Sequence, residues 1–447
     1  MKLRVKKARQ GLKGIVSVPG DKSISHRAVL WGALAEGRTE IVNFLPSEDC
    51  LCTVKACQAL GVPIHLLSPS HLVVEGVGLE GLQEPSDVID AGNSGTTLRL
   101  LTGLLAGQEF YAVLTGDASL RRRPMDRVVE PLRAMGASID GRQGGSRAPL
   151  SIRGRRPLRG LSYALPVASA QVKSALLLAG LYAREPVSVT EPLLSRDHSE
   201  RIFALFGCPL ERNGLTVTLR PGRAWKGRPV SVPGDFSSAA FLIAAALLVE
   251  GSEVTIAGVG VNPTRTGLLE VIASMGGKVE VNPAAEKEDW EPRADLRISF
   301  SPLRGTQVGG PLIPRLIDEI PILAVLALAA RGTTVVRDAA ELRVKESDRI
   351  AVLCQELGRL GGRLTPLPDG LVIEGGSPLK GAATYSHGDH RIAMALAVAG
   401  LLAEGETTVD GFQCVATSYP NFVATLQELA PGCAALVEEE ATHGGQG

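Results

Sequence analysis

The sequence predicts an α/β protein of two domains, each built from three copies of one strand–helix–strand–helix–hairpin unit. Three observations support this prediction. A chain of 447 residues is too long for a single hydrophobic core. One segment pattern recurs six times along the chain, and the hexapeptide VSVPGD occurs twice, at 16–21 and 230–235.

The recurring segment has a small or polar opening, about three turns of apolar helix, a short turn and a β-branched strand. Its copies start 66 to 83 residues apart, at Gly20, Gly92, Ala168, Gly234, Ile317 and Gly388. Each copy is followed by an amphipathic stretch that ends near a glycine and leads into further strands, as in DHSERIFALFGC at 197–208. Six such matches along one chain exclude chance.

The repeated VSVPGD hexapeptide opens the first and fourth units. A Pro-Gly pair breaks a helix and suits a chain that crosses between domains. We therefore expect residues 20–233 to form the first domain, and residues 1–19 with 234–437 to form the second. The tail 438–447 is expected to be flexible, and the polar stretch 282–295 is expected to be a surface loop within the second domain.

Composition excludes several classes of function. The chain carries 47 basic and 47 acidic residues, so it has no overall field that would attract nucleic acid or an anionic membrane. Its longest apolar runs span nine residues, about half of what a bilayer requires. The basic opening lacks the apolar stretch of a signal peptide, and the seven scattered cysteines form no CxxC pair. We expect a soluble, cytoplasmic protein with reduced thiols.

Positive charge is instead local, near the starts of the repeated helices. A helix N-terminus carries unsatisfied N–H groups and a partial positive charge, and so binds anions. Each motif alone could be an ordinary helix cap or a solvated turn. Their matching positions in the repeat predict one cleft that grips phosphate-bearing anions. The cations concerned are Lys22, Arg27, Arg99, Arg123, Lys173, Arg196, Lys345, Arg349 and Arg391.

No pattern for a metal or a standard nucleotide site is present in the sequence. His387 and His390 are the only close histidine pair, and the Gly-Asp between them favours a helix start. The chemistry must then come from cations, carboxylates and backbone N–H groups, with no metal and no cofactor.

The motifs at these points resemble those of the 5-enolpyruvylshikimate-3-phosphate synthase family, in its second bacterial class. The resemblance runs from Lys13 to Asn421 and implies the enolpyruvyl transferase fold, with three βαβαββ repeats around a pseudo-threefold axis in each domain. The motifs are, in order, PGDKSISHR, DAGNSGTTLRLL, GDASLRRRPM, ASAQVKSALLLAGL, SRDHSER, LIDEIPILAV, ELRVKESDR and GDHRIAMA.

The resemblance implies a reaction. The enolpyruvyl group of phosphoenolpyruvate is transferred to the 5-hydroxyl of shikimate 3-phosphate, with release of phosphate, in the shikimate pathway to chorismate and aromatic amino acids. It also implies inhibition by glyphosate in competition with phosphoenolpyruvate. Some second-class enzymes have alanine where this chain has Gly95. The region just before Tyr419-Pro420, residues 415–418, contains no lysine, which agrees with the second class.

Residue roles follow from the resemblance, motif by motif. Asp318 matches the acceptor of the 5-hydroxyl proton, and Glu346 and Lys22 match the candidates for protonating the methylene carbon. Glu346 would need a raised pKa for that role. The shikimate 3-phosphate positions are Lys22, Ser23, Arg27, Ser169, Ala170, Gln171, Arg196, Asp318 and Lys345. The phosphoenolpyruvate positions are Lys22, Asn93, Gly95, Thr96, Arg123, Gln171, Arg349 and Arg391.

Two alternatives stand beside this interpretation. The UDP-N-acetylglucosamine enolpyruvyl transferase family is similar, but it has a reactive cysteine where this chain has Ala118, and Lys-Asn where it has Lys22-Ser23. A non-catalytic phosphosugar-binding protein on the same scaffold would need the cations but not both Asp318 and Glu346. The resemblance leaves the role of His198 open, and we expect a monomer.

Overall fold

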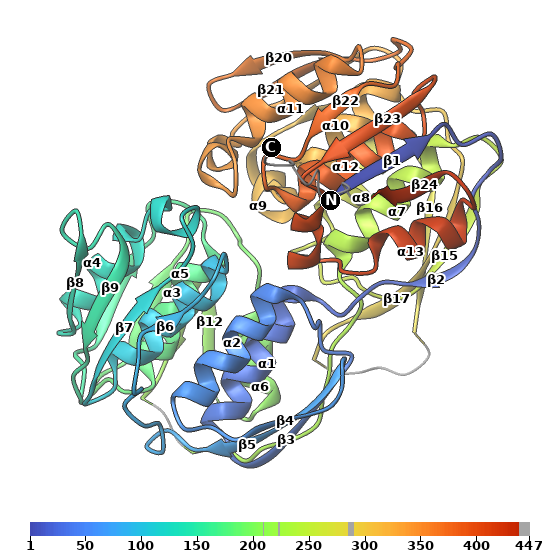
Figure 1. The fold of residues 1–447 in the computed structure, drawn as a ribbon. Coiled ribbons are helices and arrows are strands. Elements are labelled where there is room, and N and C mark those ends of the chain that lie inside the picture. The colour runs from blue at the N-terminus through green and yellow to red at the C-terminus, as the bar shows by residue number, and fades with distance from the viewer. Residues whose placement is uncertain (209, 222–223, 285–289, 438–447) are drawn as a thin grey trace, which may run out of the picture.

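The computed structural model describes residues 1–208, 210–221, 224–284 and 290–437, so the predicted tail 438–447 lies outside the described residues. Within these ranges the strands form six four-stranded sheets, one for each unit of the sequence repeat. The chain folds into two lobes (Figure 1). We call residues 20–233 the first lobe and residues 1–19 with 234–437 the second lobe. The prediction of six α/β units is confirmed.

The first lobe holds three units, and each unit contributes a buried helix and a second helix beside one sheet. The first unit has α1 (Lys22–Leu34), β3 (Glu36–Val42), α2 (Glu48–Ala59), β4 (Ile64–Ser68) and β5 (His71–Val77). The second has β6 (Ile89–Asp90), α3 (Gly95–Ala106), β7 (Tyr111–Thr115), η1 (Leu120–Arg122), α4 (Asp126–Ala134), β8 (Ser138–Arg142) and β9 (Arg147–Arg153). The third has β10 (Leu161–Ala164), α5 (Ala170–Gly180), β11 (Val187–Thr190), α6 (His198–Leu205), β12 (Leu210–Asn213) and β13 (Thr216–Leu219).

The second lobe repeats the plan. The fourth unit has α7 (Phe236–Leu248), β15 (Glu253–Gly260), α8 (Gly267–Ser274), β16 (Val279–Pro283) and β17 (Arg293–Ser299). The fifth has β18 (Gln307–Val308), η2 (Gly310–Leu312), α9 (Ile313–Leu316), α10 (Ile320–Ala329), β19 (Thr333–Val336), η3 (Ala340–Val344), α11 (Arg349–Arg359), β20 (Arg363–Leu367) and β21 (Gly370–Glu374). The sixth has β22 (Ala383–Tyr385), α12 (His390–Gly400), β23 (Glu406–Asp410), η4 (Phe412–Thr417), α13 (Phe422–Leu429), β24 (Ala434–Val437) and the N-terminal β1 (Lys2–Lys6).

The two strands that overlap the VSVPGD copies are exchanged between the first and fourth units, and each pairs within its own lobe. Strand β2 (Lys13–Ser17) pairs in parallel with β15 of the fourth unit. Strand β14 (Val230–Ser231) precedes α7 in the sequence but pairs in parallel with β3 of the first unit. The chain therefore crosses between the lobes directly after each strand, where Gly20 and Gly234 form an isolated antiparallel bridge.

Each lobe has its own hydrophobic core. One core is drawn from residues between 24 and 232, and the other from residues 3–18 and 236–434. Helices such as α10, IPILAVLALA, are apolar on all sides, and all of α10 except Ala329 is buried. These cores support the boundaries at 20–233 and 234–437, which stay a prediction.

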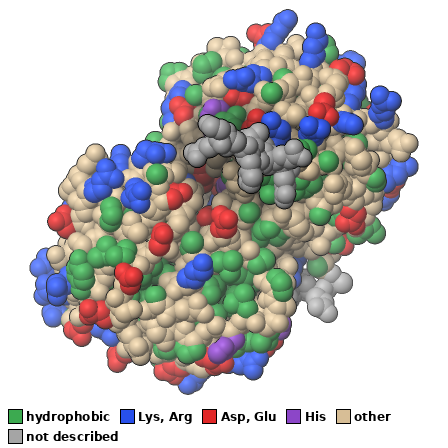
Figure 2. Space-filling view, in the orientation of Figure 1, with side chains coloured by type: hydrophobic (Ala, Val, Ile, Leu, Met, Phe, Trp, Pro, Cys, Tyr) green, Lys and Arg blue, Asp and Glu red, His purple; other side chains and the backbone are tan. Residues whose placement is uncertain are grey.

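The expectation of a plain surface loop at 282–295 is wrong for its described ends. Strands β16 and β17 take both ends, and Glu291 is buried at 1% exposure. The residue is buried because its side chain meets the first lobe, which a local pattern cannot reveal. On the face shown in Figure 2, Lys and Arg side chains are scattered among Asp and Glu, in agreement with the balanced charge.

Candidate active site

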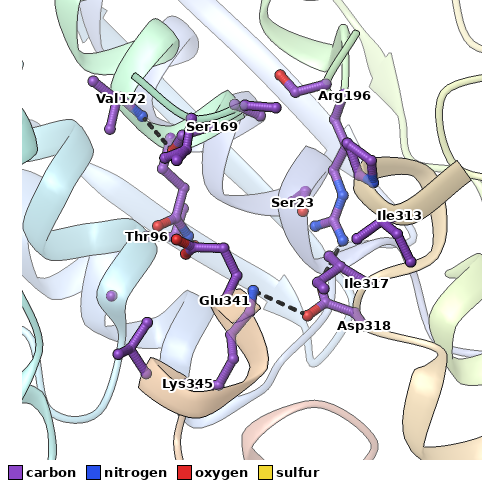
Figure 3. Close-up of a pocket in the computed structure, with 18 of the residues that line it drawn as sticks. Ser23, Thr96, Ser169, Val172, Arg196, Ile313, Ile317, Asp318, Glu341 and Lys345 are labelled. Carbon is purple, nitrogen blue, oxygen red and sulfur yellow. Dashed lines mark hydrogen bonds and ion pairs between the residues drawn. The ribbon is translucent and has the colours of Figure 1, made fainter. Parts of the chain in front are cut away.

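A cavity of about 480 Å³ lies between the lobes, walled by the starts of the core helices α1, α3 and α5 of the first lobe and α7, α10 and α12 of the second. The predicted convergence of six helix starts on one cleft is confirmed. Part of the wall is drawn in Figure 3. The predicted site residues that line it are Lys22, Ser23, Arg27, Gly95, Thr96, Arg123, Ser169, Ala170, Gln171, Arg196, Asp318, Lys345, Glu346 and Arg391.

Two predicted site residues, Asn93 and Arg349, do not line the cavity but contact groups that do. The Oδ1 atom of Asn93 accepts a hydrogen bond of 2.6 Å from Arg123. Arg349 is fully buried and donates to Glu346 Oε2 at 2.8 Å and to Asp318 Oδ1 at 3.3 Å. In this structure both residues reach the cavity only through the side chains in front of them.

Lys173 is not a cation of the cleft, and its predicted placement there is wrong. Its side chain is fully buried, and Nζ lies 2.8 Å from Glu191 Oε2 and 2.6 Å from Glu200 Oε1. The residue lies one position beyond the part of α5 that lines the cavity, so its side chain points into the lobe. Two carboxylates neutralise its charge there.

Uncharged groups hold Arg27 on the first-lobe face of the cavity. Its guanidinium donates to Ser199 Oγ at 2.8 Å, to Ser174 Oγ at 2.7 Å and to the Ser23 carbonyl at 2.9 Å. Burial lowers the pKa of Arg27 to about 10. Its positive charge is thus desolvated but not neutralised by a contacting carboxylate, a setting that favours an incoming anion.

Uncharged groups also hold Arg99, a second arginine of the cavity wall. Arg99 donates to Gln171 Oε1 at 2.7 Å and to the Pro124 carbonyl at 3.2 Å, and Gln171 donates to Thr96 Oγ1 at 2.9 Å. Burial, with Arg123 nearby, lowers the pKa of Arg99 to about 10. The chain of bonds orients the Gln171 amide at the wall.

Lys22 differs from these arginines because its ammonium pairs with Asp49. Burial alone would lower the pKa of Lys22, but Asp49 raises it above the ordinary value. Asp49 lines the cavity and has no counterpart among the predicted site residues. In this structure Lys22 is therefore held in its charged form.

Asp318 lies at the centre of the cations of both lobes. Arg196 of the first lobe and Lys345 of the second reach it from two sides (Figure 3). Arg349 Nη1 lies 3.3 Å from Oδ1, and Arg391 Nη2 lies 4.0 Å from Oδ2. Burial would raise the pKa of Asp318, but these four cations hold it well below its usual range. The carboxylate is therefore ionised and can accept a proton.

Glu346 does not have the raised pKa that a methylene-protonating acid needs. Burial acts in that direction, but Arg349 at 2.8 Å and Arg123 at 3.8 Å hold the pKa of Glu346 well below its usual range. In this structure the condition for that role is not met, because the cations outweigh desolvation. Anions bound to the same arginines would weaken this effect and raise the pKa.

The cavity wall contains further polar residues that have no place among the predicted ones. Arg127 donates to Glu341 Oε1 at 2.7 Å, and this pair joins the two lobes. Burial, Lys22 and Arg391 lower the pKa of His390 to about 3, so its ring is neutral. Among the described residues, its buried Nε2 has no hydrogen-bond partner. The signal for a role of His390 was its place at the start of the sixth repeated helix.

The described part of the chain offers no group of three or more His, Cys, Asp or Glu side chains arranged to hold a metal ion. Among the same residues, no helix is both long enough and apolar enough to cross a membrane.

Comparisons with known proteins agree with this architecture. Residues 6–426 match the family model of EPSP synthase (3-phosphoshikimate 1-carboxyvinyltransferase). The chain is 56% identical to the 3-phosphoshikimate 1-carboxyvinyltransferase of Pelotomaculum thermopropionicum over 430 residues, covering 96% of this chain and 99% of that protein. It is 55% identical to the protein of that name from Geobacter sulfurreducens, covering 94% and 97% of the two chains.

Solved structures extend the comparison to the fold. The EPSP synthase of Acinetobacter baumannii superposes with a TM-score of 0.86 at 43% identity, covering 98% of this chain and all of that one. The enolpyruvyl transferase NikO of Streptomyces tendae gives a TM-score of 0.77 at 19% identity, over 96% and 97% of the two chains, which concerns the fold alone. The predicted fold class is confirmed.

The fold and the cationic cavity define an enolpyruvyl transferase. More closely, the chain belongs to the EPSP synthase family, whose members are enzymes. The alternative of a UDP-N-acetylglucosamine enolpyruvyl transferase is not favoured, because the similar proteins named above are 3-phosphoshikimate 1-carboxyvinyltransferases.

Proposed function

We propose that this protein transfers the enolpyruvyl group of phosphoenolpyruvate to the 5-hydroxyl of shikimate 3-phosphate and releases phosphate. The observation that carries the proposal is the cavity itself, where desolvated cations of the first lobe face ionised carboxylates of the second. The reaction is part of the shikimate pathway to chorismate and aromatic amino acids. We place it in the cytoplasm, and a monomer stays a prediction.

The cations offset the charge of the two substrates. Each of the two substrates carries one phosphate and one carboxylate. These groups repel one another when the substrates meet, unless the site neutralises their charge. Arginine forks match phosphate and carboxylate oxygens with two parallel hydrogen bonds. We assign shikimate 3-phosphate to Ser23, Arg27, Ser169, Ala170, Gln171, Arg196 and Lys345, and phosphoenolpyruvate to Asn93, Gly95, Thr96, Arg123, Gln171, Arg349 and Arg391, with Lys22 between them.

The proton transfers divide between two carboxylates. Asp318 accepts the proton of the 5-hydroxyl as its oxygen adds to C2 of phosphoenolpyruvate. Glu346, or Lys22 in its place, delivers a proton to the methylene carbon. The tetrahedral adduct then loses phosphate from C2 and returns a methyl proton to Glu346, or to Lys22, which restores the double bond. The proton held by Asp318 passes to the departing phosphate, so the protonation state of the site is unchanged.

Bound substrate prepares Glu346 for this step. Its depressed pKa comes from Arg349 and Arg123, and a phosphate held by the same guanidinium groups cancels much of their effect. Burial then dominates and raises the pKa. The carboxyl group is thus protonated only when phosphoenolpyruvate is present, which links the acid to its substrate.

A phosphate-release assay tests the proposal. The full chain is mixed with both substrates in excess EDTA, and phosphate is measured with time. We expect turnover that needs both substrates and is unaffected by the chelator. Binding of shikimate 3-phosphate without phosphate release would instead indicate the non-catalytic alternative. Phosphate release from phosphoenolpyruvate with UDP-N-acetylglucosamine in place of shikimate 3-phosphate would indicate the other transferase.

A further inference from the structure

A second set of contacts between the lobes lies outside the cavity, at the first turn of α6. His198 Nδ1 donates to Glu291 Oε1 at 2.6 Å. Asn262 Nδ2 donates to Glu291 Oε2 at 3.0 Å and to Asp197 Oδ1 at 2.7 Å. Asp197 and His198 belong to the first lobe, whereas Asn262 and Glu291 belong to the second. None of these four residues lines the cavity.

The contact is buried, and the carboxylates of Glu291 and Asp197 accept hydrogen bonds. The side chains of His198 and Glu291 are 2% and 1% exposed, and both carboxylate oxygens of Glu291 accept hydrogen bonds. Burial would raise the pKa of Asp197, but Asn262 and Arg201 lower it. Moving the lobes apart at this point would break these hydrogen bonds together. We therefore expect the contact to persist when the lobes move.

The neighbouring backbone strengthens the same contact. The Trp290 carbonyl accepts a hydrogen bond of 3.0 Å from Arg201, and the Trp290 side chain packs against the first-lobe core. Arg293, the first residue of β17, donates to Ser231 Oγ at 2.7 Å, and Ser231 lies on β14 in the sheet of the first lobe. The second lobe thus grips the first from both sides of Glu291.

The geometry constrains how the lobes can move. The two chain crossovers lie together, because Gly20 and Gly234 form a bridge. They therefore act as one joint, which allows the lobes to twist as well as to close. The buried contact at Glu291 adjoins this joint, because Arg293 pairs with Gly260, whose N–H donates to the Gly234 carbonyl at 2.8 Å. A joint widened in this way resists twisting more than closing.

The contact also sets the position of a residue at the site. Arg196 immediately precedes Asp197 and pairs with Asp318 across the cavity. Because Asn262 holds Asp197, the start of α6 is fixed relative to the second lobe. The direction from which Arg196 meets Asp318 is fixed with it.

We propose that His198, Glu291 and Asn262 form a fixed pivot between the lobes, which guides their closure and positions Arg196 opposite Asp318. The inference rests on the proposed function, since Arg196 is a substrate contact only there. His198 and Glu291 are positioning residues and touch no substrate. The pivot gives His198 the role that the sequence left open.

The test uses Glu291→Ala in the full chain. We expect the Kd and the KM of shikimate 3-phosphate to rise about tenfold. Without the pivot, binding must select the closing orientation of the two lobes from a wider set of relative orientations. The conservative Glu291→Gln keeps an acceptor for His198 and loses the bond from Asn262, so about a threefold rise is expected. The KM of phosphoenolpyruvate at saturating shikimate 3-phosphate should change less than either.

The matched control is Ile298→Ala. Ile298 is fully buried on β17, the strand that follows Glu291, but belongs to the second-lobe core. This variant should lower the melting temperature and leave the Kd of shikimate 3-phosphate within about twofold. A merely structural role of Glu291 predicts the same outcome for both variants.

Equal Kd values in Glu291→Ala and Ile298→Ala, at a similar loss of melting temperature, would overturn the pivot. If Glu291→Ala does not fold, Glu291→Gln and Asn262→Ala carry the same comparison. Phosphate release by the wild type is measured first. A failure of the proposed function then appears as an inactive wild type, whereas a failure of the pivot appears only among the variants.

Discussion

The two faces of the cavity hold their arginines in opposite ways. On the first-lobe face, hydroxyl, amide and carbonyl groups hold Arg27 and Arg99, and burial lowers the pKa of each to about 10. On the second-lobe face, Arg349 contacts the carboxylates of Asp318, Glu346 and Asp389, which raise its pKa despite burial. The first face is therefore positive and ready for an anion, whereas the second is balanced and holds the acid–base groups.

The helix caps follow the same division. Ser94 and Ser169 cap α3 and α5 of the first lobe with neutral hydroxyl groups. Asp235 and Asp389 cap α7 and α12 of the second lobe with carboxylates. A carboxylate cap already satisfies the positive helix end, so α3 and α5 keep more of their attraction for a ligand anion. Asp21, which caps α1, is the exception on the first-lobe side.

The largest expected effect is on the acid–base side. Asp318→Asn removes the proton acceptor but keeps its shape, so kcat should fall by about 10²–10⁴-fold. The Kd of shikimate 3-phosphate should change far less, because the cations of the first lobe remain in place. Steady-state kinetics and binding titration measure the two quantities. Retention of more than about a tenth of the wild-type kcat would show that Asp318 is not the base.

Two arginine substitutions test the difference between the faces directly. Arg349→Met leaves three carboxylates without their shared cation, and the free energy of unfolding should fall by about 3–5 kcal/mol. Arg27→Met leaves only hydroxyl and carbonyl groups, of which Ser174 and Ser199 already bond each other at 2.6 Å. Its cost should be about 1–3 kcal/mol, and the KM of shikimate 3-phosphate should rise.

Denaturant unfolding of both variants at one pH provides the measurement. Glu346 and Asp389 stay buried in Arg349→Met, so its instability is electrostatic rather than a loss of packing. Equal losses of unfolding free energy in Arg27→Met and Arg349→Met would contradict the division between a neutral and an ionic face.

A smaller effect is expected from a methyl group at the first-lobe face. A Cβ at residue 95 would lie 2.9 Å from Arg99 Nη1 and 3.2 Å from Arg123 Nη1, both flexible ends. Gly95→Ala should therefore raise the Ki of glyphosate by about ten- to a hundredfold, as overpacking of about 1–3 kcal/mol implies. The KM of the shorter phosphoenolpyruvate should rise less.

The control for this substitution is Gly358→Ala on α11, where a Cβ meets open space. It should leave both constants unchanged. Inhibition assays against phosphoenolpyruvate give the values, and an equal rise of Ki and KM in Gly95→Ala would refute selective exclusion of glyphosate.

The smallest effect is a dependence on pH. Cations depress the pKa values of Asp318, Glu346 and Asp389. Their stabilisation is complete above the ordinary carboxyl pKa of about 4 and is lost as the pH falls through the depressed values. The wild-type melting temperature should thus not change on their account between pH 8 and pH 5, values about 4 and 1 units above that pKa.

Arg349→Met should behave in the opposite way. Without the cation, burial raises the carboxyl pKa values, so protonation at lower pH restores stability to the variant. The difference in melting temperature between wild type and variant should narrow as the pH falls from about 8 to about 5. A difference that stays constant over this range would show that the carboxylates are not held by Arg349.

The site was predictable where its signal is local. The small or polar helix starts of the repeat place Lys22, Gln171 and Arg391 correctly at one cavity, because side chains next to a helix N-terminus share its direction. Lys173 was misplaced although it lies only two residues after Gln171, since two positions along a helix turn a side chain to another face. The pKa of Glu346 could not be predicted from its local sequence, because the balance between burial and the charges of Arg349 and Arg123 is set in the folded site.

The sequence by itself determined the six α/β units, the two crossovers at Pro-Gly, the helix caps and the kinds of charged group brought to the cleft. These depend on periodicity and backbone preferences within a few residues. Only the tertiary structure decided which cations are neutralised, with which strands β2 and β14 pair, and that His198 meets Glu291. These outcomes depend on groups distant in the chain, and the strength of each charge interaction is set by distance and burial in the folded molecule.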